Sequence, residues 1–183
     1  MSAALEIVAE RGLEALTLLE AGQRAGYSRA LPAHYFGSKD QLVSALADYV
    51  VEGFVDRMQN ADFGGAGLDS LLKRIAFYID DGKRDLESLR AFHAILNAAV
   101  TNPVLRPSTA RLNSESALSY ARMIEAGINN GEICPDIDPM AQGRLILIAM
   151  RGILTQWLIA PDAVNVELLR DTFLSNLKRA LAK

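Results

Sequence analysis

Apolar residues recur every three or four positions along most of the chain, which is the spacing of amphipathic helices. Such helices are predicted at residues 1–11, 38–60, 68–82, 89–100, 107–130, 139–159 and 166–181. The start at residue 139 has a strong signal, because Asp138 can cap the helix and Pro139 suits its first position. The alternating pattern of a β-strand occurs nowhere in the sequence. The pattern therefore predicts an all-α fold.

Residues 17–36 predict two further short helices joined by a tight turn. Thr17 and Glu20 have the spacing of a capping box, in which the threonine hydroxyl accepts from a first-turn amide and the glutamate reaches back to the Thr17 amide. Gly26 is expected to end the first helix, because glycine readily takes the left-handed conformation. Ser28 can then cap the second helix, which starts at once.

Two short helices joined in this way cross steeply, so the second projects outward and can enter a major groove of DNA. Arg29 and His34 can donate hydrogen bonds to base edges. Thr17, Tyr35 and Lys39 can donate to phosphate. The residues expected to contact DNA are Thr17, Ser28, Arg29, Ala30, Leu31, Ala33, His34, Tyr35 and Lys39.

The first fifty residues resemble the DNA-binding domain of the tetracycline-repressor (TetR) family of transcriptional regulators. The matching residues are Ala3-Ala4-Leu5, Ala9-Glu10-Arg11-Gly12, Thr17, Arg24-Ala25-Gly26, Ser28, His34-Tyr35-Phe36, Ser38-Lys39 and Leu42. The resemblance implies phosphate contacts by Thr17, Tyr35 and Lys39. It implies base contacts by residues 29–33 together with His34. A basic segment usually precedes the first helix in this family, whereas Met1 here falls where the predicted helix has already begun, so either the start codon is placed too late or the segment is absent.

Two features depart from the usual pattern of this family. Pro32 stands in the second short helix, where a residue without an amide hydrogen is tolerated only in the first turn. That helix is therefore expected to start late or to be distorted. Ala21 and Gly22 replace a larger aliphatic residue and an alanine, which predicts thinner packing and a propensity cost of roughly 1 kcal/mol at the glycine.

A glycine-rich segment at residues 61–67 follows the long helix at 38–60 and is expected to separate two domains. Residues 1–60 would form a three-helix helix-turn-helix head with its connecting helix. Residues 61–183 would form a helical bundle for ligand binding and dimerisation.

The last two predicted helices carry more apolar surface than one core can cover. The helix at 139–159 is apolar nearly all round from Leu145, and the helix at 166–181 carries two apolar stripes. Adjacent antiparallel helices with surplus apolar faces are typical of a two-fold, four-helix interface. A homodimer is therefore predicted, with an interface that includes Leu145, Ile148, Gly152, Leu174 and Leu181.

Aromatic and polar side chains on the central helices indicate a small-molecule pocket. They are Phe77, Tyr78, Phe92, His93, Leu96, Tyr120, Met123 and Trp157. On general grounds such a stripe is more often ordinary core, but the resemblance to the TetR family implies an inducer site in the C-terminal bundle. The nucleophile-elbow, zinc-protease, P-loop and dinucleotide-binding motifs are absent from the sequence. We therefore expect no catalysis, no cofactor and no metal site.

Composition and charge narrow the choice of partners. The formal net charge of −3 argues against indiscriminate binding to nucleic acid, which is driven mainly by cations. The lone Cys134 excludes an intramolecular disulfide and fits a reduced cytoplasm. The most apolar segment, residues 145–160, is interrupted by Arg151 and Gln156 and is shorter than the ~20 residues that a bilayer requires.

Together, the residues and the resemblance predict a ligand-responsive transcriptional regulator. It would act as a repressor that binds a palindromic DNA operator as a homodimer and is released by a small-molecule inducer. The alternative is a helical, dimeric interaction module or small-molecule-binding module that does not bind DNA.

Overall fold

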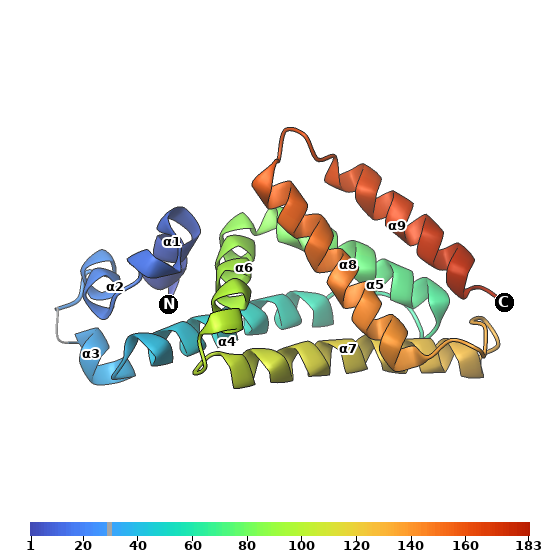
Figure 1. The fold of residues 1–183 in the computed structure, drawn as a ribbon, viewed down its shortest axis with the longest axis horizontal. Helices are drawn as coiled ribbons and strands as arrows, with labels where there is room; N and C mark the ends of the chain where they lie inside the picture. Colours follow the sequence, from blue (N-terminus) through green and yellow to red (C-terminus); the bar gives the residue numbers. More distant parts are fainter. Residues whose placement is uncertain (29–30) are drawn as a thin grey trace. The chain divides into compact units, whose positions relative to one another are not determined.

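The computed structural model describes residues 1–28 and 31–183, which form helices connected by loops (Figure 1). The helices are α1 (Ser2–Arg11), η1 (Leu13–Ala15), α2 (Leu18–Arg24), α3 (Leu31–Phe36), α4 (Lys39–Gln59), α5 (Leu68–Arg84), α6 (Leu86–Thr101), α7 (Arg106–Asn129), α8 (Pro139–Ile159) and α9 (Val166–Leu181). The described residues contain no strand beyond one isolated bridge, between Ile133 and Ala182. The predicted all-α fold is confirmed. Among these helices, none has the length and hydropathy needed to cross a membrane.

Most helix ends lie where local capping signals predict them. Asp138 Oδ1 accepts hydrogen bonds from two amides in the first turn of α8, both at 2.9 Å. The end of α5 is different, because this helix continues through Gly82 to Arg84. Asp85 then caps α6 by accepting from the Ser88 amide at 3.2 Å. The glycine alone is therefore insufficient to stop α5, and the break falls at the next capping residue.

The chain groups into two compact units, neither of which is contiguous in sequence. The head unit consists of Met1–Arg57 and Lys83–Arg111, and the bundle unit consists of Met58–Gly82 and Leu112–Lys183. The packing therefore does not follow a boundary near residue 60, because α6 belongs to the head unit. The functional division at that boundary remains a prediction.

The core of the head unit depends on α6, which packs against α1. Ala91, Ile95 and Ala99 of α6 lie in the same apolar cluster as Ile7 of α1. Small side chains at such a contact permit a short distance between helix axes. Val100, which the apolar pattern places on the buried face of this helix, is 73% exposed. The buried face of α6 is thus the alanine face.

Two polar contacts fasten α4 to α6 within the head unit. Arg57 Nη2, near the end of α4, lies 3.2 Å from Asp85 Oδ2 at the start of α6. Asn102 Nδ2, at the end of α6, donates to Asp40 Oδ1 in the first turn of α4 at 3.2 Å. The end of each helix is therefore joined to the start of the other.

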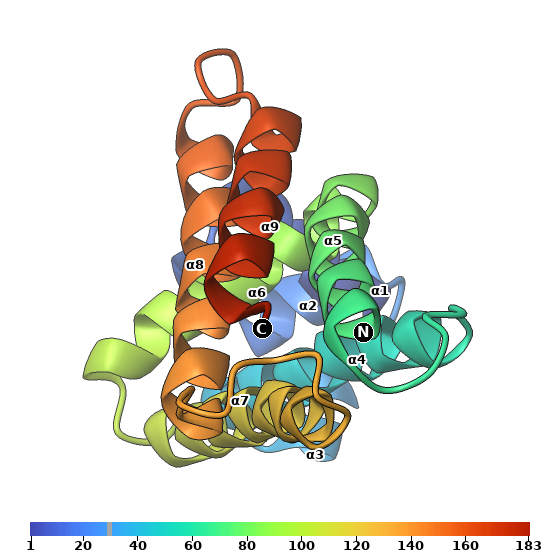
Figure 2. The same cartoon turned by 90° about the vertical axis from the view of Figure 1, so that its right-hand side faces the viewer.

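The bundle unit is built from α5, most of α7, α8 and α9. Its fully buried side chains come from each of these helices and include Ile79, Ile124, Ile146, Met150 and Leu181. Helices α8 and α9 lie side by side and antiparallel in both views (Figures 1 and 2). This arrangement is the one predicted for the last two helices.

The loop after α7 ties distant parts of the bundle unit together. The amide of Leu68, the first residue of α5, donates to Glu132 Oε2 at 2.8 Å. The Glu132 carbonyl accepts from the Lys183 amide at 3.3 Å, and the Cys134 amide donates to the Leu181 carbonyl at 2.9 Å. One loop thus satisfies backbone groups at the start of α5 and at the end of α9.

Candidate functional site

Helices α2 and α3 form the predicted helix-turn-helix within the head unit. Thr17 Oγ1 accepts from the Glu20 amide at 3.0 Å and so caps α2. The helix ends at a turn in which Gly26 has a φ of 75°, a left-handed conformation that other residues rarely adopt. The Tyr27 amide donates to the Gly22 carbonyl at 2.9 Å and closes the turn. The predicted cap and the predicted glycine end of this helix are confirmed.

Gly22 and Pro32, the two unusual residues of this hairpin, pack against each other. Pro32 lies in the first turn of α3 as described, and it is buried. A Cβ atom added to Gly22 would lie 2.7 Å from Pro32 Cγ and 3.4 Å from the Ser28 carbonyl oxygen. A proline ring has little freedom to move away. The glycine therefore makes room for the proline, and the expectation of thin packing is wrong at this position.

The outward face of α3 carries four of the nine side chains predicted to contact DNA. The exposed ones are Leu31, Ala33, His34 and Tyr35. Tyr35 is 78% exposed, and its ring makes a T-shaped contact with the half-buried Phe36 ring at a centroid distance of 4.8 Å. Arg29 and Ala30 lie outside the described residues. A short exposed helix after a tight turn is the arrangement that places side chains in a major groove.

The predicted phosphate-binding groups beside α3 retain free donors. Thr17 is exposed, and its hydroxyl, which accepts from a backbone amide, still has its own hydrogen to donate. Ser28 is also exposed. Lys39 Nζ donates to the Glu14 carbonyl at 3.3 Å, and its ammonium group has two further hydrogens. The geometry is compatible with the predicted contacts, which remain predictions.

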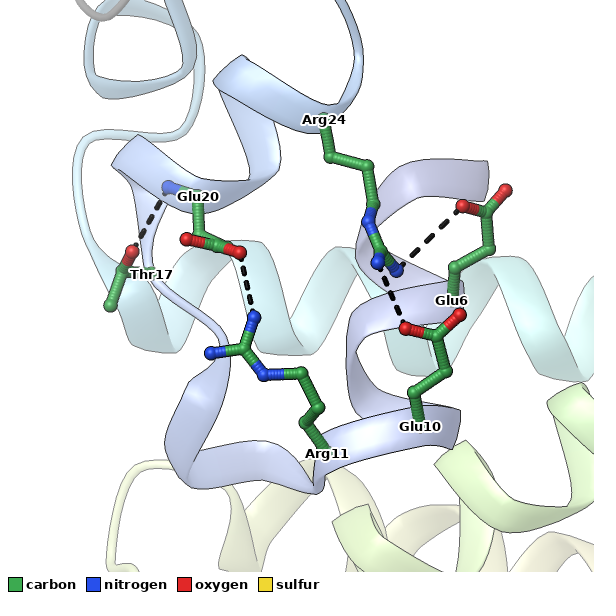
Figure 3. A network of polar contacts seen from close by, with 6 residues as sticks. All are labelled: Glu6, Glu10, Arg11, Thr17, Glu20 and Arg24. Atoms are coloured by element: carbon green, nitrogen blue, oxygen red, sulfur yellow. Dashed lines mark hydrogen bonds and ion pairs between the residues drawn. The ribbon is translucent and has the colours of Figure 1, made fainter.

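A network of ion pairs joins α1 to α2 (Figure 3). Arg24 of α2 lies between two carboxylates of α1, with Nη2 2.8 Å from Glu10 Oε2 and Nη1 3.8 Å from Glu6 Oε2. Arg11 Nη1 lies 2.7 Å from Glu20 Oε1. The Glu20 carboxylate therefore turns toward Arg11 rather than back to the cap of its own helix, and that part of the capping-box prediction is wrong.

This network also affects the charge that the head presents to DNA. Exposed ion pairs contribute only about 0–1 kcal/mol each to stability, so their main effect is on orientation and charge. Arg11 and Arg24 already face carboxylates, which offsets their attraction for phosphate. We therefore expect the affinity of this head for DNA to depend mainly on other groups, such as Lys39.

The residues predicted to line a ligand pocket divide between the two units. Phe92, His93 and Leu96 lie on α6 in the head unit, where His93 is buried beside Phe92 with a ring-centroid distance of 6.2 Å. The bundle unit holds Phe77, Tyr78, Tyr120, Met123 and Trp157. Within the bundle unit, Tyr78 and Tyr120 stand out because they belong to a polar cluster.

The polar cluster of the bundle unit is formed by residues from α5, α7 and α8. Arg151 makes a side-chain hydrogen bond to Tyr78, and its Nη1 donates to Asn113 Oδ1 at 2.6 Å. Tyr120 Oη donates to Met150 Sδ at 3.7 Å. Burial raises the pKa of both tyrosines, and the positive charge of Arg151 partly opposes this rise. Both phenols are therefore neutral donors at physiological pH.

Arg74, one turn before Tyr78 on α5, is the second cation of this cluster. Its charge also acts on Tyr120. Its Cζ lies 4.7 Å from the centroid of the Phe63 ring, and its Nε is buried without a hydrogen-bond partner among the described residues. We refer to Arg74, Tyr78, Tyr120 and Arg151 as the arginine-tyrosine cluster. The two arginines were missed in the pocket prediction, although Arg151 visibly interrupts the apolar segment 145–160.

The residues predicted to form a dimer interface differ in exposure. Leu145, Ile148 and Gly152 are exposed on one face of α8, and Leu174 of α9 is half-buried. Leu181 is fully buried within the single chain. Its inclusion in the interface is wrong, because its side chain already packs in the core of the bundle unit. Ile159 and Leu168 are exposed apolar residues that the prediction did not name.

Comparison with known proteins gives matches over both parts of the chain. Residues 1–46 match the family described as bacterial regulatory proteins, tetR family. Residues 68–182 match the family described as BetI-type transcriptional repressor, C-terminal. The HTH-type transcriptional regulator BetI of Rhizobium meliloti (strain 1021) is 47% identical over 156 residues, which cover 81% of this chain and 71% of that protein.

Solved structures share the fold over almost the whole chain. A TetR transcription regulator from Haloarcula marismortui ATCC 43049 has a TM-score of 0.86 at 21% identity, covering 100% of this chain and 95% of its own. A transcriptional regulator from Saccharomonospora viridis, solved in complex with choline, has a TM-score of 0.82 at 16% identity, with the same coverage of both chains. At these identities the likeness concerns the fold.

Proposed function

Because the chain belongs to the TetR family of bacterial regulatory proteins and matches a BetI-type repressor in its C-terminal part, we propose that it represses transcription by binding a palindromic DNA operator as a homodimer. A small-molecule inducer bound by the C-terminal part releases it from the operator. The observation that carries this proposal is the exposed face of α3, which follows a capped α2 and a glycine turn. Such a hairpin is built to present one helix to a major groove.

In this proposal residues 1–60 read the operator. Arg29 and His34 donate to base edges, and the apolar side chains beside them can contact thymine methyl groups. Thr17, Tyr35 and Lys39 hold the backbone phosphates and set the register of α3 without reading sequence. The exposure of His34, Tyr35 and Thr17 supports these roles.

Residues 61–183 bind the inducer and dimerise. The exposed apolar face of α8, with Leu145 and Ile148, supports an interface between two copies, to which Gly152 and the half-buried Leu174 would contribute. Removing one leucine-sized side chain from water contributes roughly 1.5–3 kcal/mol, so several such residues are a substantial driving force. A two-fold dimer presents two copies of α3, and its operator is therefore palindromic.

An inducer releases the repressor only if it binds one head spacing more tightly than the other. The other class of function is a dimeric module that binds a small molecule but no DNA. The carboxylates beside Arg11 and Arg24 favour that alternative, and the helix-turn-helix opposes it. We further propose that the protein is not an enzyme and that it acts in the cytoplasm, where its operator lies.

Selection of binding sites from random DNA, followed by titration at two salt concentrations, tests the DNA-binding role. Arg29→Ala should lose roughly 1–3 kcal/mol of binding free energy and relax specificity at one base pair. Lys39→Ala should weaken binding to all DNA sequences alike, and it should lower the slope of log binding constant against log salt concentration by about one. Lys178→Ala, on the exposed surface of α9, is the matched charge control and should change neither quantity.

The proposal fails if the selection enriches no palindrome. It also fails if Arg29→Ala selects the same sequence as the unaltered protein. In either case the dimeric module without DNA binding becomes the better description.

A further inference from the structure

We propose that the small molecule recognised by the bundle unit is an organic carboxylate, held by the guanidinium groups of Arg74 and Arg151 with the hydroxyls of Tyr78 and Tyr120 as additional donors. This inference rests on the proposed function, because it assigns a chemical class to the inducer. It concerns residues of the bundle unit alone.

The arrangement of the cluster is suited to an anion. Three helices supply its groups: Arg74 and Tyr78 from α5, Tyr120 from α7 and Arg151 from α8. Burial and the neighbouring Tyr78 raise the pKa of the Tyr120 phenol, and the positive charges of both arginines oppose this rise. A guanidinium group is planar and matches the two oxygens of a carboxylate, which makes arginine the usual partner of such ligands.

Two donors of the cluster, on Arg74 and Tyr120, have a missing or a weak acceptor. Arg74 Nε is buried without a hydrogen-bond partner among the described residues, although buried donors are normally satisfied. Tyr120 Oη donates to the Met150 sulfur, which is a poor acceptor. A carboxylate would be a much better acceptor for both groups. Arg74 and Arg151 are each half-buried, and a charge partly removed from water is stabilised by a compensating partner.

The same groups disfavour a cationic ligand. Quaternary ammonium ligands are recognised by the faces of aromatic rings. In this chain the Phe63 ring already faces the Arg74 guanidinium, at 4.7 Å, and its edge contact with Phe77 has a centroid distance of 5.4 Å. A bound cation would be repelled by Arg74 and Arg151. The Saccharomonospora protein bound to choline shares only the fold, so its ligand sets no expectation here.

The position of Arg151 connects this site to the proposed interface. Arg151 lies on α8 between Ile148 and Gly152, which are exposed on the face expected to meet a second copy. Its side chain reaches inward to Asn113 and Tyr78. A carboxylate that moves this side chain therefore acts on the helix that is proposed to form the dimer interface.

Calorimetric titration of the full chain with matched probes tests the inference. The anions are benzoate, phenylacetate and octanoate, and the controls are their neutral amides and choline. At least one carboxylate should bind about tenfold or more tightly than its amide, because only the anion forms charge-assisted bonds. Arg74→Met and Arg151→Met should each lose about tenfold in carboxylate affinity and leave amide affinity unchanged. Arg122→Met, on the exposed side of α7, should bind like the unaltered protein.

Three results would overturn the inference: an amide or choline that binds as tightly as the carboxylates, no binding of any carboxylate at 10 mM, or unchanged binding by both arginine variants. If a methionine variant fails to fold, the comparison of acid with amide on the unaltered protein decides the question. Operator binding is measured in parallel. If the unaltered protein binds no operator in the absence of ligand, the proposed repressor is refuted, whereas operator binding without carboxylate binding would refute only the ligand class.

Discussion

At the scale of single residues, Gly22 and Pro32 are sterically coupled. A proline near the start of a recognition helix needs space, and a glycine in the middle of α2 costs helix propensity. In this head the two occur together because the ring of Pro32 occupies the volume that a side chain at residue 22 would need. The glycine in α2 is therefore compatible with a well-packed hairpin when residue 32 is proline.

This pairing predicts opposite effects of one substitution in two backgrounds. Gly22→Ala should lower the free energy of unfolding by roughly 1–3 kcal/mol, because the added methyl overpacks the contact with Pro32. In a Pro32→Ala background the same change should be neutral or should stabilise by up to about 1 kcal/mol through helix propensity. Denaturant unfolding of the four proteins measures the coupling.

Gly53→Ala is the matched control for this cycle. It also replaces a glycine inside a helix of the head unit, but its Cβ would meet only the flexible end of Arg57 at 3.4 Å. It should stabilise by about 0.5–1 kcal/mol in either background. If the effects of Gly22→Ala and Pro32→Ala are additive, the steric account of the pair is incorrect.

At the scale of elements, α6 is part of the head although the sequence separates it from α1 by more than seventy residues. It contributes an alanine face to the core and polar contacts to both ends of α4. Since α3 leads directly into α4, the helix that is proposed to read DNA is supported by an element that follows the glycine-rich segment. A change in the position of α6 would therefore be transmitted to α4, and through α4 to α3.

A larger residue on the alanine face should disrupt this packing. Ala91→Leu should reduce the free energy of unfolding by roughly 1–3 kcal/mol, because Ala91 is fully buried where α6 packs into the head core. Val100→Leu, on the exposed side of the same helix, should change it by less than about 0.5 kcal/mol. Thermal and denaturant unfolding check both values. Equal effects of the two substitutions would contradict the assigned buried face.

The features that sequence predicts well here are local ones. The caps at Thr17 and Asp138 and the turn at Gly26 involve residues within a few positions of each other, and the structure confirms them. The matches also confirm the predicted family and its regulatory function. The contacting faces depend on the partner element, which a helical pattern does not contain. For this reason the pattern favoured Val100 over the alanines of α6 and assigned Leu181 to an interface.

In the candidate site, too, local features could be predicted from sequence, whereas contacts between helices could not. Exposed positions on α3 follow from the hairpin, so their exposure could be predicted from sequence, and their contacts with DNA stay a prediction. The arginine-tyrosine cluster requires α5, α7 and α8 to be placed together, and an arginine in an apolar helix indicates only that something polar must meet it. The aromatic pattern alone grouped residues that lie in different units.

At the scale of the whole molecule, the apolar face of α8 is exposed in the single chain, and we expect it to be buried by a partner. Ile148 is 65% exposed, and Leu145, Ile159 and Leu168 are also exposed. Several large apolar side chains exposed on one helix face and on its neighbour α9 are typical of a protein interface. A second copy of the chain is the occupant that the proposed operator symmetry requires.

A charge on this face should separate the copies. Ile148→Glu should convert a dimer to a monomer at micromolar concentration, because a carboxylate without a partner would be buried twice across the two-fold axis. Asn97→Glu, which adds the same charge to an exposed position of α6, should leave the dimer intact. Light scattering gives the mass in each case. A monomeric unaltered protein would contradict the prediction.

The cap of α5 has a consequence for synthesis of the chain on the ribosome. The amide of Leu68 is satisfied by a carboxylate that follows 64 residues later, at Glu132. Glu132 has not yet been translated when α5 emerges from the ribosome. The Leu68 amide therefore lacks this hydrogen-bond acceptor until α7 and the loop after it have left the exit tunnel. Packing of the head core is also incomplete until α6 has been translated, because α6 supplies part of that core. Neither unit can therefore reach its final packing before later residues are translated, and a nascent chain halted before residue 83 would hold the helix-turn-helix sequence without the part of the head core that α6 supplies.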